Sequence, residues 1–335
     1  MIIFAIETSC DETAAAIVDV PTRQILAQTL TSEILSNAPY GGVVPELTAR
    51  AHQQHLPAIV NQTLAKSGLG WPQINAIAAT TGPGLTTALV IGSTFAKTLA
   101  VATGKPFLAT NHIEGHALTP HLTNPALTFP YLLLLVSGGH CQLVNVNNVG
   151  DYQLLGTTVD DAVGECFDKV GKLLGLPHPA GPAIENLAKT GNPHAIKLPH
   201  PLKDQSLNFS FSGLKTAVRE HLLKHPDTNH ADLAASFQHT AAEILTYKTK
   251  RAIQQTQATQ VVAAGGVAAN LTIRAKLQQI CAEHHATFSA PPLKLCGDNA
   301  VMIAYAAGLR HLANLPNTGL PTAVRPRWPL SESHI

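Results

Sequence analysis

The stretch that decides the fold is IIFAIETSCDETAAAIVDV, residues 2–20. Residues 2–6 and most of residues 14–20 are apolar, and the polar turn at residues 7–13 separates these two runs. Short apolar runs bounded by turn residues are typical of buried strands. We therefore expect a strand, a carboxylate-rich turn and a returning strand at the start of the chain.

A second unit of the same design is YLLLLVSGGHCQLVNV, residues 131–146. Two similar hairpins so far apart favour a duplicated, two-lobed fold. Around them, we expect helices at residues 45–67, 85–103, 161–174, 182–189 and 233–257, and strands at residues 74–79, 106–109 and 261–264. This alternation predicts an α/β protein in which helices cover parallel or mixed sheets.

Composition narrows the class of protein and its compartment. The 335 residues are 45% hydrophobic and 13% charged, with a net charge of +1, so any RNA contact is expected to be local or shared with partner subunits. Five scattered cysteines without a C-x-x-C pair fit reduced thiols in the cytoplasm. The N-terminus lacks a basic region, and Gly and Pro break both long uncharged runs, so we expect neither a signal peptide nor a membrane span.

A candidate metal site begins with His112 and His116, which follow the expected strand at residues 106–109. Side chains at positions i and i+4 share one helix face, so both imidazoles could reach one ion. Asp298 precedes the apolar run at residues 300–307 and could cap that helix or bind the same ion. The histidine pair alone is weak evidence for a metal site, because a second such pair, His221 and His225, fits a solvated helix face.

Zinc peptidases offer an alternative reading of this segment, because they carry the motif H-E-x-x-H. In this chain the acid, Glu114, stands two residues after His112. That position lies about 200° around a helix from His112, so Glu114 is expected to point away from the metal.

Two acidic groups have open interpretations. Glu7, Asp11 and Glu12 could hold a hydrated Mg²⁺ near a phosphate, or form an ordinary acidic turn. Asp161, Glu165 and Asp168 share one helix face, either as a solvated stripe or with one of them accepting ribose hydroxyls.

Three glycine turns, at residues 82–84, 137–139 and 264–266, each follow an expected strand. Backbone N–H groups at such turns can bind phosphate oxygens. The three turns together favour a bound nucleotide, whereas tight turns without a ligand remain the alternative.

Taken together, the motifs resemble the tRNA threonylcarbamoyladenosine transferase family along residues 6–330. The motifs are ETSCDET (7–13), GGVVPEL (41–47), GPGL (82–85), NHIEGH (111–116), LVSGG (135–139), FDK (167–169), FSFSGLK (209–215), AGGVAAN (264–270), DNAVMIAY (298–305) and RPRW (325–328). The resemblance implies the two-lobed actin/sugar-kinase/Hsp70-like fold. Its first lobe would span residues 1–110, completed by residues 299–335, and its second lobe residues 111–298, with the active site in the cleft between them.

The resemblance also implies the reaction and its residues. The family transfers a threonylcarbamoyl group from threonylcarbamoyl-AMP to N6 of the adenosine 3′ of the anticodon, in tRNAs that read codons starting with A. It implies Fe²⁺ or Zn²⁺ on His112, His116 and Asp298, Mg²⁺ with the nucleotide, and Asp11 and Glu12 as catalytic helpers. The residues implied for the adenylate are Leu135, Val136, Ser137, Gly138, Gly139, Asp168, Gly181, Glu185 and Asn270.

Three positions depart from the family pattern. Asn111 stands where many relatives carry another His, and we exclude it as a ligand. Ala180 replaces a common Gly before Gly181. Leu135 stands where archaeal and eukaryotic relatives have a Tyr, which indicates a bacterial or organellar chain.

The expected partners are tRNA, a degenerate paralogue subunit (TsaB-like) and a small ATPase (TsaE-like), with no membrane. The paralogue interface could include the helix at residues 45–67. The remaining alternatives are a kinase-like ATPase of the same fold with Asp11 as base, the metallopeptidase, and a non-catalytic scaffold.

Overall fold

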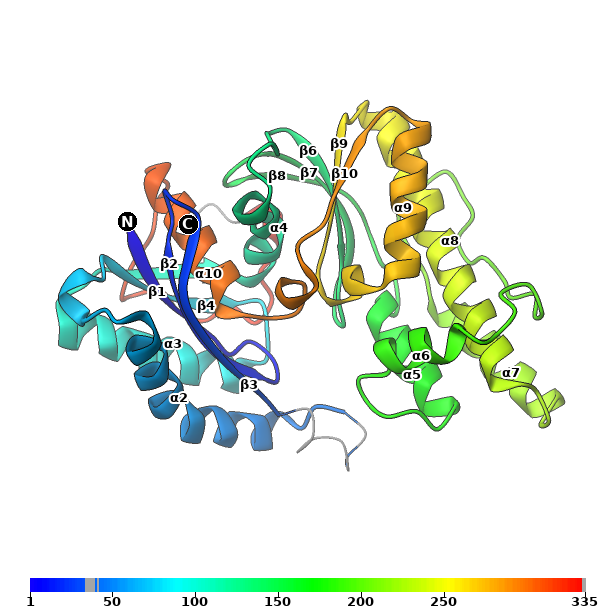
Figure 1. Ribbon diagram of the computed structural model, residues 1–335, viewed down its shortest axis with the longest axis horizontal. Helices are drawn as coiled ribbons and strands as arrows, with labels where there is room; N and C mark the ends of the chain where they lie inside the picture. Colours follow the sequence, from blue (N-terminus) through cyan, green and yellow to red (C-terminus); the bar gives the residue numbers. More distant parts are fainter. Residues whose placement is uncertain (34–39, 41, 333–335) are drawn as a thin grey trace. The chain divides into compact units, whose positions relative to one another are not determined.

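The computed structural model describes residues 1–33, 40 and 42–332 (Figure 1). Gly41, the first residue of the GGVVPEL motif, lies outside the described residues. The chain forms two compact units: unit 1 comprises Met1–Leu127, Asn148–Tyr152 and Asp298–Ile335, and unit 2 comprises Thr128–Asn147 and Gln153–Gly297. The first boundary differs from the expected one after residue 110, because the helix that follows packs within unit 1.

Unit 1 contains a mixed five-stranded sheet. Its strands are β1 (Ile2–Glu7), β2 (Glu12–Asp19), β3 (Gln24–Ser32), β4 (Ala76–Gly82) and β5 (Phe107–Asn111), in the spatial order β3-β2-β1-β4-β5. The predicted first hairpin is confirmed: β1 and β2 are antiparallel, with Glu7 opposite Ala14. β1 and β4 are parallel, as are β4 and β5, so the polar ends of β1 and β5 lie at the same edge of the sheet.

Helices cover both faces of this sheet, which explains why its strands are apolar almost throughout. α2 (Pro45–Ser67) and α3 (Thr86–Thr103) pack on one face, where Phe4 and Ile17 meet Leu56 of α2. α10 (Ala300–Leu312) packs against β1, β2 and β4, and α4 (His112–Thr123) packs against α10. Two short 3₁₀ helices, η2 (Trp71–Gln73) and η5 (Leu330–Glu332), complete the unit.

Unit 2 repeats the same topology. Its strands are β6 (Tyr131–Val136), β7 (Cys141–Asn148), β8 (Asp151–Thr157), β9 (Gln260–Ala264) and β10 (Thr287–Ser289), in the order β10-β9-β6-β7-β8. β6 pairs antiparallel with β7 and parallel with β9, as β1 does with β2 and β4. The predicted duplication of a mixed sheet is therefore confirmed.

The second sheet packs on a helical layer with a shared core of Leu, Val, Ile, Ala and Phe side chains. Its helices are α5 (Val163–Leu173), α6 (Ala180–Ala188), α7 (Ser212–Lys224), α8 (His230–Thr256) and α9 (Leu271–Glu283), with the 3₁₀ helices η3 (Gly266–Ala269) and η4 (Leu293–Leu295). Figure 1 shows α8 and α9 running side by side, and α6 and α9 both contact α8.

One helix in the described part of the chain, α3, is long and apolar enough to cross a membrane by length and composition alone. Six of its residues are buried within unit 1: Ala88, Leu89, Gly92, Ser93, Ala96 and Ala100. A helix that packs on a sheet has the same apolar composition. From the sequence, we accordingly expect no membrane span here.

Candidate metal centre and nucleotide pocket

The two candidate histidines are placed by the start of α4. The Asn111 side chain accepts hydrogen bonds from the backbone N–H groups of Ile113 and Glu114, at 2.8 and 3.2 Å, and so caps the helix. His112 is the first helical residue and His116 follows one turn later, with 4.8 Å between the ring centroids. Asn111 thus has a structural role, in agreement with its exclusion as a ligand.

Asp298 completes the cluster from the start of α10. Asn299, not Asp298, caps this helix, because its side chain accepts from the Met302 N–H at 3.0 Å. The capping interpretation of Asp298 was therefore wrong. Its Oδ1 lies 3.0 Å from His116 Nε2 and 3.5 Å from His112 Nε2 instead.

The donor set of this cluster fits a divalent ion. One ligand atom from each of His112, His116 and Asp298 lies within 4.8 Å of the other two. Both histidines are buried, whereas the Asp298 side chain is 22% exposed. Two imidazoles and one carboxylate suit iron or zinc and leave coordination positions open.

A buried carboxylate orients His112 from behind. His112 Nδ1 lies 3.3 Å from Glu7 Oε2 and 3.0 Å from Ser9 Oγ, which leaves Nε2 toward Asp298. Glu7 is fully buried and also accepts from the Thr80 hydroxyl and the Ser9 N–H. A group so enclosed does not form part of a hydrated Mg²⁺ site. Its position is that of the carboxylates that orient metal-binding histidines.

The same contacts shift the protonation of these groups. Burial alone raises the pKa of Glu7, but the attraction and hydrogen bond of His112 outweigh it and hold that pKa below its ordinary value. Burial lowers the pKa of His112, but Asp298 and Glu7 raise it to about 9. In the metal-free protein, His112 therefore carries a proton that a metal ion has to displace.

The catalytic candidates lie in the first hairpin of the same unit: Asp11 is in the turn after β1, and Glu12 is the first residue of β2. Burial, together with the negative charges of Asp298 and Asp11, raises the pKa of Glu12 to about 10. Glu12 is therefore a neutral carboxylic acid at pH 7 in the metal-free protein, able to donate a hydrogen bond.

A residue that the sequence did not single out holds this turn. His52 of α2 is fully buried; its Nε2 lies 3.0 Å from the Cys10 carbonyl and its Nδ1 lies 2.7 Å from Thr13 Oγ1. A carbonyl only accepts, so Nε2 carries the proton and Nδ1 accepts from the hydroxyl. Burial lowers the pKa of His52, which keeps the ring neutral. No local pattern indicates this contact, which joins residues about 40 positions apart.

Glu114 has a structural role. It is buried, accepts from the Tyr152 hydroxyl at 2.7 Å and pairs with Arg310 at 3.0 Å. Its carboxylate is thus committed away from the histidine cluster, as the spacing predicted, and is not placed to act as the base of a peptidase.

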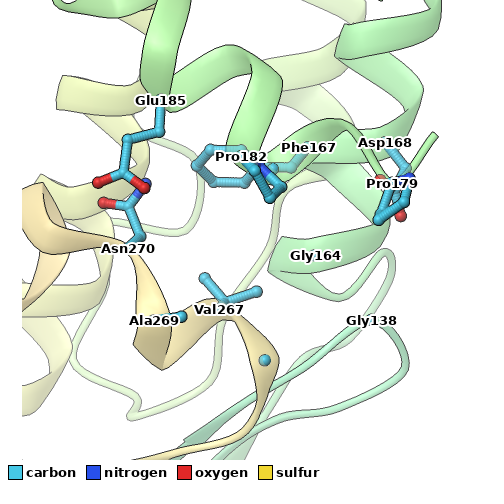
Figure 2. A pocket seen from close by; sticks show the side chains of 12 residues that line it. Gly138, Gly164, Phe167, Asp168, Pro179, Pro182, Glu185, Val267, Ala269 and Asn270 are labelled. Atoms are coloured by element: carbon cyan, nitrogen blue, oxygen red, sulfur yellow. The ribbon is translucent and has the colours of Figure 1, made fainter. Parts of the chain in front are cut away.

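Unit 2 contains a pocket of about 260 Å³ (Figure 2). Five of the nine predicted substrate-binding residues line it: Gly138, Asp168, Gly181, Glu185 and Asn270. The other lining residues are Gly164, Phe167, Pro179, Pro182, Gly266, Val267 and Ala269. An apolar floor with a few polar groups is the usual composition of a small-molecule site.

Hydrogen bonds fix the polar groups of this pocket. Asp168 Oδ1 accepts from the Ala180 N–H at 2.7 Å, and Glu185 Oε1 accepts from the Leu271 N–H at 2.7 Å. Figure 2 shows Glu185 beside Asn270, with Asp168 across the pocket. The carboxylates therefore face the pocket from two sides, an arrangement suited to hydroxyl donors.

Asn270 both caps α9 and borders the pocket. Its Oδ1 accepts from the Ile273 N–H at 2.9 Å, and its amide donates to Gln238 Oε1 at 2.7 Å. Gln238, on α8, in turn donates to Thr272 Oγ1 at 3.0 Å. Gln238 is thus a positioning residue that sequence inspection missed.

The remaining substrate-binding candidates lie beside the pocket rather than on its wall. Leu135 and Val136 are wholly buried in β6, the Ser137 hydroxyl accepts from the His140 N–H at 3.1 Å, and Gly139 is exposed. Their predicted contacts with the substrate stay predictions.

The sequence left open the roles of the acidic stripe and the glycine turns. Each group contains residues that line the pocket and residues that do not. In the acidic stripe, Asp161 and Glu165 pair with Lys169 at 2.7 and 2.8 Å, whereas Asp168 lines the pocket. Among the glycine turns, Gly138 and Gly266 line the pocket. The turn at residues 82–84 packs instead on Arg325 and Ser9, where a Cβ has no room.

Comparison with solved structures defines the fold class. The chain resembles HypF from T. kodakarensis (TM-score 0.63, 13% identity, covering 94% of this chain and 48% of HypF). It also resembles component A of the (R)-2-hydroxyglutaryl-CoA dehydratase of Acidaminococcus fermentans (TM-score 0.55, 15% identity, 92% and 97%). These proteins share the duplicated actin/sugar-kinase/Hsp70-like fold.

Sequence comparison then defines the family. The profile of the tRNA N6-adenosine threonylcarbamoyltransferase family (TsaD) matches residues 24–305. The tRNA N6-adenosine threonylcarbamoyltransferases of Brucella anthropi and Brucella suis are each 51% identical over 346 residues, covering 99% of this chain and 96% of each relative. The chain belongs to this family, and the predicted family is confirmed.

Proposed function

We propose that this chain transfers the threonylcarbamoyl group of threonylcarbamoyl-AMP to N6 of the adenosine 3′ of the anticodon, in tRNAs that read codons starting with A. Membership of the transferase family supports the reaction. The observation that carries the assignment of residues is the convergence of His112, His116 and Asp298 on one point. We also propose a cytoplasmic location, which membership of a tRNA-modifying family supports.

His112, His116 and Asp298 would hold one Fe²⁺ or Zn²⁺, and a second ion, Mg²⁺, would accompany the nucleotide. The bound metal would supply a Lewis acid for the charge that develops on the carbamoyl oxygen. Glu7 and Ser9 keep His112 in the orientation that this binding needs.

The pocket of unit 2 would hold the adenylate of the donor. Asp168 and Glu185 are placed to accept ribose hydroxyls, and Asn270 is held by Gln238 for the adenosine. During transfer, the adenosine amine forms a bond to the carbamoyl carbon, the bond from that carbon to the phosphate oxygen breaks, and AMP leaves. The amine loses one proton, which Asp11 is proposed to accept, with Glu12 beside it as a neutral hydrogen-bond donor. That the reaction takes place in the cleft between the lobes stays a prediction.

The test is a reconstituted transfer assay with threonylcarbamoyl-AMP, unmodified tRNA and the partner subunits. His112→Ala should reduce transfer at least about 100-fold, since it removes one of three metal ligands. His225→Ala is the matched control and should transfer normally, because His225 is exposed and follows the end of α7. Equal transfer by wild type and His112→Ala would remove the metal from the mechanism and favour the non-catalytic scaffold.

The proposed partners are a degenerate paralogue of the same fold and a small ATPase. We assign the paralogue interface to α2, whose exposed residues include Leu47. Leu47→Asp should weaken heterodimer formation, whereas Arg50→Ala on the same helix should not. Unchanged association of Leu47→Asp would move the interface elsewhere.

A further inference from the structure

A cluster of cations surrounds one aromatic ring in unit 2, away from both candidate sites. Lys203, Lys248 and Arg251 lie over the Tyr247 ring, at 6.0, 5.8 and 5.9 Å from its centroid. Three of the five cation–π contacts within residues 1–33, 40 and 42–332 thus converge on Tyr247. We call Lys203, Tyr247, Lys248, Lys250 and Arg251 the Tyr247 platform.

The platform is held rigidly. Lys248 is 1% exposed, and its Nζ donates to Asp204 Oδ1 at 2.9 Å and to the Ser206 carbonyl at 2.8 Å. Arg251 Nη2 donates to the Gln205 carbonyl at 2.7 Å. These bonds fasten the loop at residues 203–206 onto α8, so Lys203 and Tyr247 are arranged before any ligand binds.

The exposed charge of the platform is positive and unneutralised. Lys203 and Lys250 are exposed, and in the described part of the chain neither they nor Arg251 pairs with a carboxylate. Glu243, which lines the adjoining hollow, lies 3.1 Å from both His200 Nε2 and His239 Nε2. A hollow of about 270 Å³ adjoins the ring, lined by His200, Pro201, Lys203, Glu243, Ile244, Thr246, Tyr247, Lys248, Lys250 and Ile280.

Two exposed lysines beside a half-buried aromatic ring, next to a hollow, offer the charge and the stacking surface with which proteins bind single-stranded nucleic acid. Lysines neutralise phosphates, and the ring stacks on a base or ribose. A chain whose net charge is only +1 needs such a local concentration of charge to bind RNA. An acidic protein surface would use the lysines but has no need of the stacking face.

We propose that the Tyr247 platform binds the single-stranded loop of the tRNA substrate, with Lys203 and Lys250 on phosphates and Tyr247 stacked on a nucleotide. This inference rests on the proposed function. Tyr247 lies nine residues after Gln238 on α8, about 14 Å along the helix axis. Gln238 is hydrogen-bonded to Asn270, which lines the pocket, so α8 carries both a support of the pocket and the platform.

The test measures the Kd for unmodified tRNA, with the partner subunits present, across a range of salt concentrations. The Lys203→Glu/Lys250→Glu double variant should weaken binding at least about 10-fold and flatten the dependence of log K on log salt by about 1.4 for two lost phosphate contacts. Tyr247→Leu should also weaken binding, whereas Tyr247→Phe, which keeps the ring, should bind like wild type. The control is Arg219→Glu/Lys224→Glu, which reverses two exposed charges on α7 and should leave the Kd unchanged.

Transfer assays separate this inference from the function on which it rests. The platform variants should raise KM for tRNA and leave kcat nearly unchanged. A wild type that binds tRNA but transfers nothing contradicts the proposed function alone. Platform variants that fold and bind tRNA like wild type overturn the inference. Unchanged tRNA affinity with weakened binding of a partner subunit also overturns it, and assigns the platform to an acidic protein.

Discussion

At the scale of single residues, His112 shows how the candidate centre is built. One ring nitrogen faces Asp298, and the other contacts the buried Glu7 and Ser9. Because both nitrogens have defined neighbours, the ring has one orientation. Metal binding would therefore not carry the free-energy cost of ordering the ring.

Replacing Glu7 tests this orientation. Glu7→Gln removes the negative charge behind His112 and should weaken metal binding 10- to 100-fold, the usual effect of losing such a carboxylate. Competition with a chelator measures the affinity. Glu46→Gln, on the exposed part of α2, is the control, and equal affinities for the two variants would show that Glu7 does not support the site.

Glu12 predicts a pH dependence of stability in the metal-free protein. Its pKa is raised from 4.5 to about 10, so the folded state binds this proton more tightly than the unfolded state. The resulting stabilisation is complete below pH 4.5 and is lost as the pH rises toward 10. Glu12→Gln does not titrate, so its melting temperature should match wild type at pH 5 and exceed it by several degrees at pH 8.

The upper limit of this difference between pH 5 and pH 8 is about 4 kcal/mol, at 1.36 kcal/mol for each pH unit. Thermal unfolding of both proteins at the two pH values provides the measurement. A difference in melting temperature that does not change with pH would show that Glu12 is ionised in the folded protein.

Sequence predicted the three candidate ligand residues that the structure brings together, but not the residues that support them. His112 and His116 are visible as a spacing on one helix, and Asp298 as a carboxylate before another. For Glu7 the sequence left open a hydrated Mg²⁺ site or an ordinary acidic turn. It did not reveal the contact with His112, because that contact spans 105 residues. Only the sheet, which places the ends of β1 and β5 at one edge, brings them together.

At the scale of elements, α2 is coupled to the turn that contains Asp11 and leads into Glu12. His52 bridges the Cys10 carbonyl and the Thr13 hydroxyl, on either side of Asp11 and Glu12. A partner subunit that binds α2 would therefore contact the helix that holds this turn in place.

Replacing His52 tests the coupling. His52→Ala leaves two buried polar groups without their partner, so the free energy of unfolding should fall by about 1–3 kcal/mol and kcat for transfer should fall with it. His55→Ala, three residues further along α2 and 44% exposed, should change the free energy of unfolding and kcat by far less. Denaturant unfolding and the transfer assay measure the two effects; a kcat equal to wild type in His52→Ala would remove His52 from the function.

The cap of α9 offers a second test at this scale. Asn270→Ala removes both the cap and the amide, so stability should fall by about 0.5–2 kcal/mol and KM for threonylcarbamoyl-AMP should rise. Asn229→Ala removes a similar cap from α8, outside the pocket, and should cost stability without changing KM. Equal KM values for the two variants would contradict a role of Asn270 in binding the donor.

The elements found from the sequence are the strongly apolar or periodic ones. The helix at Pro45–Ser67 has the predicted bounds, and the strands and helices around residues 74–109 and 161–189 shift by a few residues. β3, β8 and β10 were not predicted. The first two mix polar and apolar residues and the third has only three residues, so none forms an apolar run.

At the scale of the whole molecule, one topology occurs twice with different chemistry. The sheets of units 1 and 2 have the same strand order and directions, yet the His–His–Asp cluster belongs to unit 1 and the pocket to unit 2. Duplication was predictable from the two hairpins. The placement of the cluster in unit 1 and the pocket in unit 2 was not predictable, because it depends on residues that follow the strands rather than on the strands.

The most direct test measures bound metal and transfer rate in the same preparations of His112→Ala, His116→Ala and Asp298→Ala, with wild type and His225→Ala beside them. We expect about one Fe²⁺ or Zn²⁺ per chain in wild type and His225→Ala, and the joint loss of metal and transfer in the other three. Normal transfer by any of those three variants, once it is shown to be free of metal, would contradict the proposed centre.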